Sequence, residues 1–143
     1  MKFIKFFCIS IVLMVLSTNG IGQDISSIVF INELDGKKTA TYGDALRMFE
    51  FQEITSGSDS YMLKGYNDEA RLTKGMASLM MARSLKLNKS FMYNIFDIER
   101  YAYRACLADK FFSEFGSEND IMSGSELIEL FAKLDEFIES RRR

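Results

Sequence analysis

Residues 123–140 read SGSELIELFAKLDEFIES, and this stretch decides the fold class. Its apolar residues recur three and four positions apart, which places them on one face of an α-helix, and its charged residues occupy the opposite face. Ser123 and Glu126 match a capping box, in which the hydroxyl and the carboxylate each satisfy a free backbone N–H at the helix start. The stretch predicts a long amphipathic helix that begins after Ser123 and packs against a core.

Three other segments have the helical spacing of apolar residues: 41–51, 73–87 and 98–112. Residues 73–87 are apolar around most of the helix, so we expect this segment at the centre of the domain. Its methionines are typical of core filling, and an adaptable binding surface around Met76, Met80 and Met81 is the alternative. Together these segments predict an all-α fold, a small helical bundle.

The segment before the first predicted helix has a different pattern. Residues 25–34 (ISSIVFINEL) are rich in β-branched side chains, and the Asp-Gly pair at 35–36 is a turn signal before the short segment 37–42. Two interpretations stay open, a short β-hairpin and an ordered arm. We therefore expect an N-terminal arm or hairpin over residues 23–40, followed by one helical domain over residues 41–143.

The first 22 residues have the three-part layout of a secretory signal peptide. Lys2 and Lys5 supply positive charge, residues 6–16 form an apolar run, and small residues precede Gln23. A run of this length rises about 16 Å as a helix, roughly half of a bilayer's hydrocarbon core, so a cleaved signal is favoured over an uncleaved membrane anchor. We expect an exported protein, in the periplasm or cell envelope, that contacts the membrane only through this signal segment.

The composition excludes several classes of function. The chain has 18 Lys and Arg against 20 Asp and Glu, a balance that gives no electrostatic attraction to nucleic acid. It has no His, so Ser-His-Asp and Cys-His catalysis are excluded and the commonest metal ligand is missing. Cys8 lies in the predicted signal, which leaves Cys106 as the one thiol of the mature chain, most simply a buried small residue. We expect neither a metal nor a cofactor.

Motifs for catalysis are also missing from the sequence. It contains no phosphate-binding loop, no dinucleotide fingerprint and no Ser-x-x-Lys pair. A hydrolase that uses two carboxylates stays open, but no pair of acids is marked out and the chain left after the signal is short for a cleft. We therefore expect a protein that is not an enzyme.

Three segments of the sequence align with one another: residues 41–49, 73–81 and 123–131. Each begins with a hydroxyl residue in the capping position and has apolar residues four, seven and eight positions later. Internal repetition of this kind is typical of copies of one supersecondary unit that share a core. We expect three related helix starts.

On these residues the chain resembles the S-layer homology (SLH) domain family. The repeats of that family run from an aromatic-Asp pair through one helix and a glycine-rich loop into a Thr-Arg-Ala-Glu helix. Phe96-Asp97 with residues 101–103 is similar to the start of a unit, and residues 72–75 and 122–126 are similar to two second-helix starts. The resemblance implies a bundle of three repeat units at the cell envelope, over residues 40–135.

The motifs of the family are degenerate in this chain. Lys74 stands where the family has Arg, and Met76 stands where it has Glu. Glu126 and, more loosely, Asp44 retain the acidic residue, and the usual loop Pro is absent.

The predicted ligand-binding residues are Thr73, Lys74, Arg100 and Arg104. They place a hydroxyl and a cation at the second helix start, with two neighbouring arginines one turn apart; pairing of the arginines with local carboxylates is the alternative. The predicted function is non-covalent recognition of a cell-envelope polymer, of anionic character, or of an envelope protein. The alternative function is an exported protein-interaction domain that uses an apolar helix face around the methionines.

Overall fold

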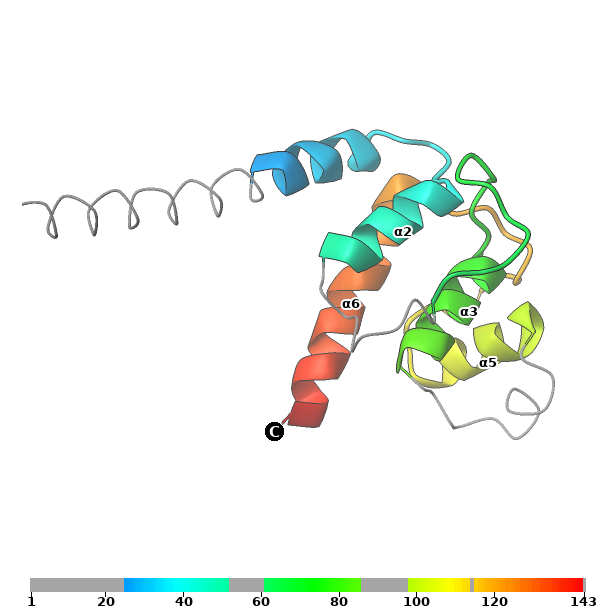
Figure 1. Cartoon of the computed structure of the whole chain (residues 1–143). Helices are drawn as coiled ribbons and strands as arrows, with labels where there is room; N and C mark the ends of the chain where they lie inside the picture. Colours follow the sequence, from blue (N-terminus) through cyan, green and yellow to red (C-terminus); the bar gives the residue numbers. More distant parts are fainter. Residues whose placement is uncertain (1–24, 52–60, 86–97, 114, 143) are drawn as a thin grey trace, which may run out of the picture. The chain divides into compact units, whose positions relative to one another are not determined.

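The computed structural model describes residues 25–51, 61–85, 98–113 and 115–142 (Figure 1). The predicted signal peptide, residues 1–22, and the predicted aromatic-Asp pair Phe96-Asp97 lie outside these residues. The chain divides into two compact units, Met1–Glu33 and Leu34–Arg143. Residues 25–33, the described part of the first unit, are helical.

The second unit is built from helices. They are α2 (Tyr42–Phe51), α3 (Lys74–Leu85), α5 (Glu99–Ala108) and α6 (Gly124–Arg142). Within the described residues there is no β-strand, only two isolated β-bridges. The predicted all-α class is confirmed, with α3 packed against α5 and α2 beside α6 (Figure 1).

Of the two interpretations left open for the N-terminal segment, the β-hairpin is wrong. Residues 25–35 are helical, and the chain turns after Leu34 through a hydrogen bond of 2.9 Å from the Lys37 N–H to the Leu34 carbonyl. The backbone N–H and carbonyl of Ala40 bond to segments far along the chain. β-Propensity depends on the neighbours that a segment finds, so the β-branched residues of this segment did not decide its structure. Residues 34–40, which we assigned to the arm, belong to the second unit.

The apolar positions shared by the three aligned segments are all buried. They are Ala45, Met48, Phe49, Ala77, Met80, Met81, Leu127, Leu130 and Phe131. Phe49 of α2 stacks on Tyr61 and meets Phe131 of α6 edge to face, with ring centroids 4.8 Å apart in both pairs. Such aromatic pairs add about 0.5–1.5 kcal/mol beyond the burial of their area. The core predicted from helical spacing is confirmed for all three helices.

Each of the three predicted helix caps is confirmed. The hydroxyls of Thr41, Thr73 and Ser123 accept hydrogen bonds of 3.1–3.2 Å from the N–H three residues later. At the first and third caps a carboxylate closes the reciprocal bond: the Thr41 N–H donates to Asp44 at 3.0 Å and the Ser123 N–H to Glu126 at 2.8 Å. A methionine stands at this position of the second cap, so no carboxylate closes that bond.

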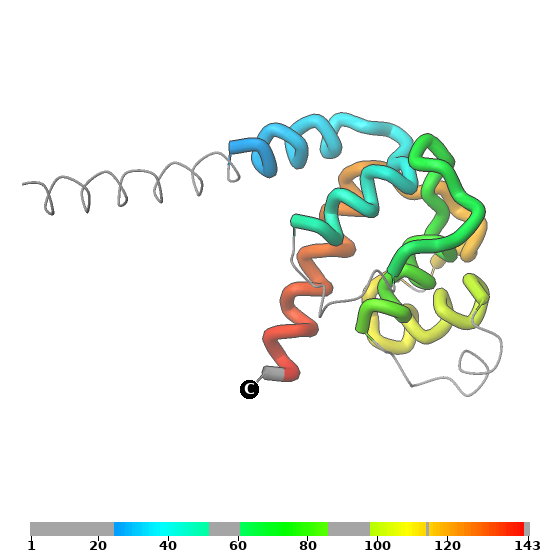
Figure 2. Tube along the Cα trace, viewed as in Figure 1, coloured from blue at the N-terminus to red at the C-terminus, as the bar shows by residue number. Residues whose placement is uncertain are grey.

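The residues before the three caps form a closed ring of backbone hydrogen bonds. Figure 2 shows that the cyan, green and orange stretches of the trace that contain them run close together. The Ala40 N–H donates to the Met122 carbonyl, the Met122 N–H to the Leu72 carbonyl, and the Leu72 N–H to the Ala40 carbonyl, at 2.8–2.9 Å. All three side chains are fully buried. Because each residue directly precedes its cap, the three helix starts follow one another in cyclic order around one point.

A second set of bonds joins each helix start to the segment that leads to another cap. The first N–H groups of a helix have no partner within the helix; here the Gly75 N–H donates to the Glu118 carbonyl at 2.8 Å and the Gly124 N–H to the Lys37 carbonyl at 2.9 Å. A Cβ on Gly75 would lie 2.9 Å from that Glu118 oxygen, and a Cβ on Gly124 would collide with the carbonyl of Leu34. Glycine therefore permits this close approach of the backbone.

Helix α5 ends earlier than the spacing predicts. The prediction covered residues 98–112, whereas α5 ends at Ala108. Lys110 adopts the left-handed conformation (φ 64°), and its N–H and that of the next residue bond back to the last turn as a Schellman motif. This turn takes Phe111 out of the helix and against Phe137 of α6, with ring centroids 5.2 Å apart. A left-handed position is usually glycine, so a lysine there gives no signal in the sequence.

Candidate functional site

The three helix starts differ most in their first helical residue. At the first start this residue is Tyr42, which is buried and whose hydroxyl accepts a hydrogen bond of 2.7 Å from the Leu63 N–H. At the third start it is Gly124, which has no side chain and packs against Leu34. At the second start it is Lys74, which brings an ammonium group to this position.

Among the described residues, the Lys74 ammonium has two carboxylate neighbours and no short hydrogen bond. Its Nζ is 3.8 Å from Asp120 Oδ2 and 3.7 Å from Glu126 Oε1, and only 14% of the side chain is exposed. These distances exceed the 2.7–3.2 Å or so of a direct N–H···O bond. An ammonium has three N–H donors, so Lys74 retains donor capacity for a ligand.

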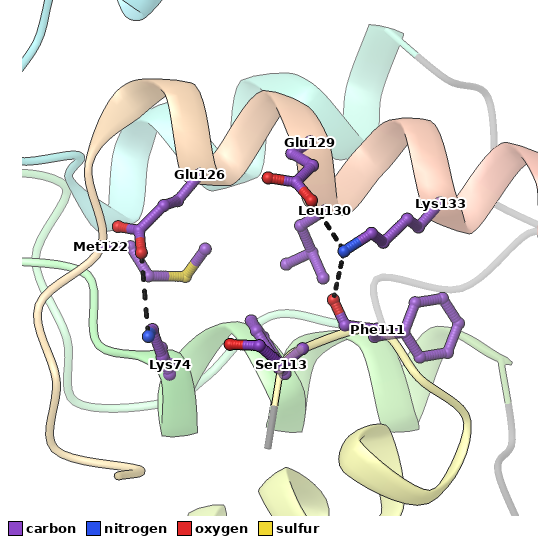
Figure 3. Close-up of a pocket in the computed structure, with 9 residues that line it drawn as sticks. Lys74, Phe111, Ser113, Met122, Glu126, Glu129, Leu130 and Lys133 are labelled. Atoms are coloured by element: carbon purple, nitrogen blue, oxygen red, sulfur yellow. Dashed lines mark hydrogen bonds and ion pairs between the residues drawn. The ribbon is translucent and has the colours of Figure 1, made fainter. Parts of the chain in front are cut away.

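A cavity of about 250 Å³ opens beside Lys74, between α3 and α6 (Figure 3). We call it the Lys74 cavity. Its floor is apolar, because the buried side chains of Met122 and Leu130 lie there. Phe111 and Phe112 also line it, and the turn that ends α5 positions both of them.

The rim of the Lys74 cavity is polar and carries both signs of charge. Lys133 of α6 lies 2.7 Å from Glu129 and donates a hydrogen bond of 3.5 Å to the Phe111 carbonyl (Figure 3). Glu126 and the exposed Ser113 complete the rim. The cavity therefore offers hydrogen-bond donors and acceptors around an apolar floor.

The hydroxyl of Tyr103 is a second polar group close to Lys74. It is buried and has no hydrogen-bond partner among the described residues. Burial, followed by the negative charges of Asp120 and Glu118, raises the pKa of the Tyr103 phenol. A Cβ on Gly116 would lie 3.2 Å from both the Tyr103 hydroxyl and the Lys74 Nζ. The two groups thus meet at a small space that glycine leaves open.

Only one of the four predicted ligand-binding residues lines this cavity, and it is Lys74. The Thr73 hydroxyl is occupied as the cap of α3. Arg100 is exposed and lines a different cavity, together with Glu99. Arg104 is exposed on α5 and is not among the residues that line the Lys74 cavity. The two arginines are therefore not grouped with the lysine at the second helix start.

The apolar face offered as the alternative binding surface is inside the core. Met76, Met80 and Met81 are at most 3% exposed. A partner protein cannot contact side chains buried to this extent, so these methionines do not form a binding surface. Cys106 is buried as expected, and burial raises the pKa of its thiol to about 12, which makes the thiol unreactive.

Sequence reasoning missed Lys133, Phe111 and Ser113 as residues of the site. Lys133 follows Glu129 by four positions, the spacing of an ordinary ion pair on a solvated helix face. Phe111 and Ser113 fall in or just after a segment predicted as helical. The signal for this site in the sequence was Lys74, at the first position of α3, because cations are disfavoured at helix N-termini.

Within the residues that the structure describes, no group of three or more His, Cys, Asp or Glu side chains is arranged to hold a metal ion. No helix among them combines the length and the apolar character needed to cross a bilayer. Comparisons with protein-family models, with curated proteins and with solved structures found no match to this chain.

Proposed function

We propose that this chain is an exported, non-enzymatic module of the cell envelope that binds an envelope polymer at the Lys74 cavity. In this proposal the three helix starts around the hydrogen-bonded ring are degenerate repeat units of the S-layer homology type. The ring supports this reading because it relates residues at the same position of each aligned segment. An envelope protein as the partner is the alternative outcome of the tests below.

The observation that carries the proposal is the place of the Lys74 ammonium. The positive end of the α3 dipole disfavours a cation in the first turn by about 0.3–1 kcal/mol. The side chain is also largely removed from water, and its two carboxylate neighbours stay at 3.7 and 3.8 Å. A residue that breaks a local rule of stability without full compensation is expected at a functional site.

The carboxylates of the cavity favour binding over catalysis. Glu126 accepts a hydrogen bond of 2.8 Å from the Ser123 N–H as part of the helix cap, and Glu129 lies 2.7 Å from Lys133. A glycosidase needs one carboxyl that can donate a proton and a second across the scissile bond. Here both acids come from one turn of α6, and each already has a partner: Glu126 in the helix cap and Glu129 with Lys133.

The binding part of the proposal is tested by retention on purified envelope material from the source organism. We expect the wild-type chain to be retained and Lys74→Ala to lose at least about tenfold in affinity, the effect of one charge-assisted hydrogen bond. Lys64→Ala is the matched control, because Lys64 is exposed and lies outside the Lys74 cavity. Equal retention of Lys74→Ala and wild type would remove this site.

The export part is tested separately, by cell fractionation and N-terminal sequencing. We expect the chain in the periplasmic or envelope fraction with Gln23 as its first residue. A chain that keeps Met1 and stays in the cytoplasm would contradict export, whatever its binding properties.

A further inference from the structure

The charges around the Lys74 cavity cancel rather than accumulate. Lys74 faces Asp120 and Glu126 at 3.8 and 3.7 Å, and Lys133 faces Glu129 at 2.7 Å. An anion that approached Lys74 would also approach the two carboxylates beside it, whose repulsion offsets the attraction by the single ammonium. The electrostatics therefore give an acidic ligand no advantage at this site.

The hydrogen-bonding groups of the cavity are mixed in kind. Lys74 and Lys133 can only donate, the carboxylates of Glu126 and Glu129 accept, and the hydroxyl of Ser113 does both. A carboxylate or phosphate oxygen of a ligand only accepts, so it would match the lysines and the Ser113 hydroxyl but not the two carboxylates. A hydroxyl group donates and accepts, and thus matches every group on the rim.

The apolar floor and the size of the cavity further restrict the chemical class of the ligand. Met122 and Leu130 present carbon atoms between the polar groups. A sugar ring has C–H faces with hydroxyls at its edge, so it fits an apolar floor inside a polar rim. The volume of about 250 Å³ is below the roughly 300–1,000 Å³ of pockets for whole drug-sized ligands, which suits one ring of a longer chain.

We propose that the Lys74 cavity binds one uncharged, hydroxyl-rich sugar unit of an envelope saccharide. Hydrogen bonds from Lys74 and Lys133 hold the hydroxyls, and Met122 and Leu130 contact the face of the ring. This inference rests on the proposed function and names the class of its ligand. It departs from the anionic polymer that the sequence led us to expect.

The test uses the envelope polysaccharides of the source organism, separated by anion exchange into a neutral and an acidic fraction and immobilised. We expect the chain to bind the neutral fraction, with less than about threefold change in affinity between low and high salt, because salt screens net charge. Binding confined to the acidic fraction, or binding of whole envelope material but of neither fraction, would overturn the inference and leave the proposed function standing. Failure to bind any envelope material would reject both.

Two substitutions at one position separate the charge of Lys74 from its hydrogen bonds. Lys74→Met removes both, whereas Lys74→Gln keeps N–H donors on an uncharged side chain. We expect the affinity for the neutral fraction to fall about tenfold in Lys74→Met and only about threefold in Lys74→Gln. An equally large loss for both variants would show that charge decides binding, against the inference. Thermal unfolding confirms that each variant is folded, and Lys64→Met controls for loss of a surface lysine.

Discussion

The first and third helix starts have a complete capping box, and we call them closed. The second start has only the hydroxyl half of that box, and we call it open. At the first and third, a hydroxyl and a carboxylate bond reciprocally across the cap. The second has the hydroxyl bond alone. The first helical residue follows the same division: Tyr42 is hydrogen-bonded and buried, Gly124 has no side chain, and Lys74 projects an ammonium beside a cavity.

The difference is informative because the three starts have the same backbone arrangement. The same ring of hydrogen bonds and the same buried positions support all of them. The first start also has a hollow next to it, which Lys37 and Arg47 line; Lys37 lies 2.7 Å from Asp44, and Arg47 is exposed. Under the proposed function, the first and third starts serve stability, and the second, with the Lys74 ammonium beside its cavity, serves binding.

The substitution with the largest expected effect on stability lies at the third start. Gly124→Ala would ordinarily stabilise a helix by about 1 kcal/mol, but its Cβ would collide with the Leu34 carbonyl. Because backbone cannot move aside as a side chain does, we expect a loss of about 3 kcal/mol in the free energy of unfolding. Denaturation in urea measures it.

Ser125→Ala, at the next position of the same turn and exposed, is the control and is expected to change stability by at most about 0.5 kcal/mol. A stabilised Gly124→Ala variant would contradict the close approach of this helix start to Leu34.

The body of α3, unlike its start, is buried against α5. The Cys106 thiol of α5 donates a hydrogen bond of 3.8 Å to the Ser78 carbonyl of α3, so it reports on this contact. Burial, as the largest cause, raises its pKa from 9.0 to about 12. Between pH 9 and 12 the unfolded chain loses the proton and the folded chain keeps it, so stability falls with rising pH by about 1.4 kcal/mol per unit from this group. The contribution is fully present below pH 9.

The measurement is the unfolding free energy of wild type minus that of Cys106→Ala across this range, which removes the shared titration of Lys and Tyr side chains. A difference that does not change with pH would mean that the thiol is accessible in the folded chain.

Double-mutant cycles sharpen the contrast between the caps. Ser123→Ala combined with Glu126→Ala is expected to show a coupling energy of about 0.5–1 kcal/mol, because the side chain of each residue accepts a hydrogen bond from the backbone N–H of the other. Thr73→Ala combined with Met76→Leu is expected to be additive within about 0.5 kcal/mol. Equal coupling at both starts would show that the second cap is closed by a contact of another kind.

The smallest expected effect concerns the turn that forms one wall of the cavity. Lys110 is left-handed at φ 64°, a conformation that glycine adopts without cost. Lys110→Gly is therefore expected to stabilise the chain by about 0.5 kcal/mol. Asp109→Gly, one position earlier in an ordinary conformation (φ −87°), should destabilise it instead.

Local patterns in the sequence predicted the helices and their caps well. The hydroxyl residues followed by apolar positions at helical spacing located three helix starts and nine core residues, because burial on one face imposes that spacing. Residues 25–35 were misread, since β-propensity depends on tertiary neighbours that one segment does not reveal.

The cavity itself could not be predicted from sequence. It is lined by the start of α3, by α6 and by the segment after the turn at Lys110, and a lysine in the left-handed conformation directs that segment to the cavity. The charge balance was hidden for a similar reason. Asp120 and Glu126 reach Lys74 only because the segment before the third cap bonds to the start of α3.

One measurement tests most directly that the second start alone is open to a ligand. Amide resonances of the isotope-labelled chain are followed by nuclear magnetic resonance while solubilised envelope polysaccharide is added. We predict shifts that cluster at Lys74, Ser113 and Lys133, with the amides of Lys37 and Asp44 unchanged. Shifts centred on Lys37 and Asp44, or on all three helix starts alike, would contradict the account.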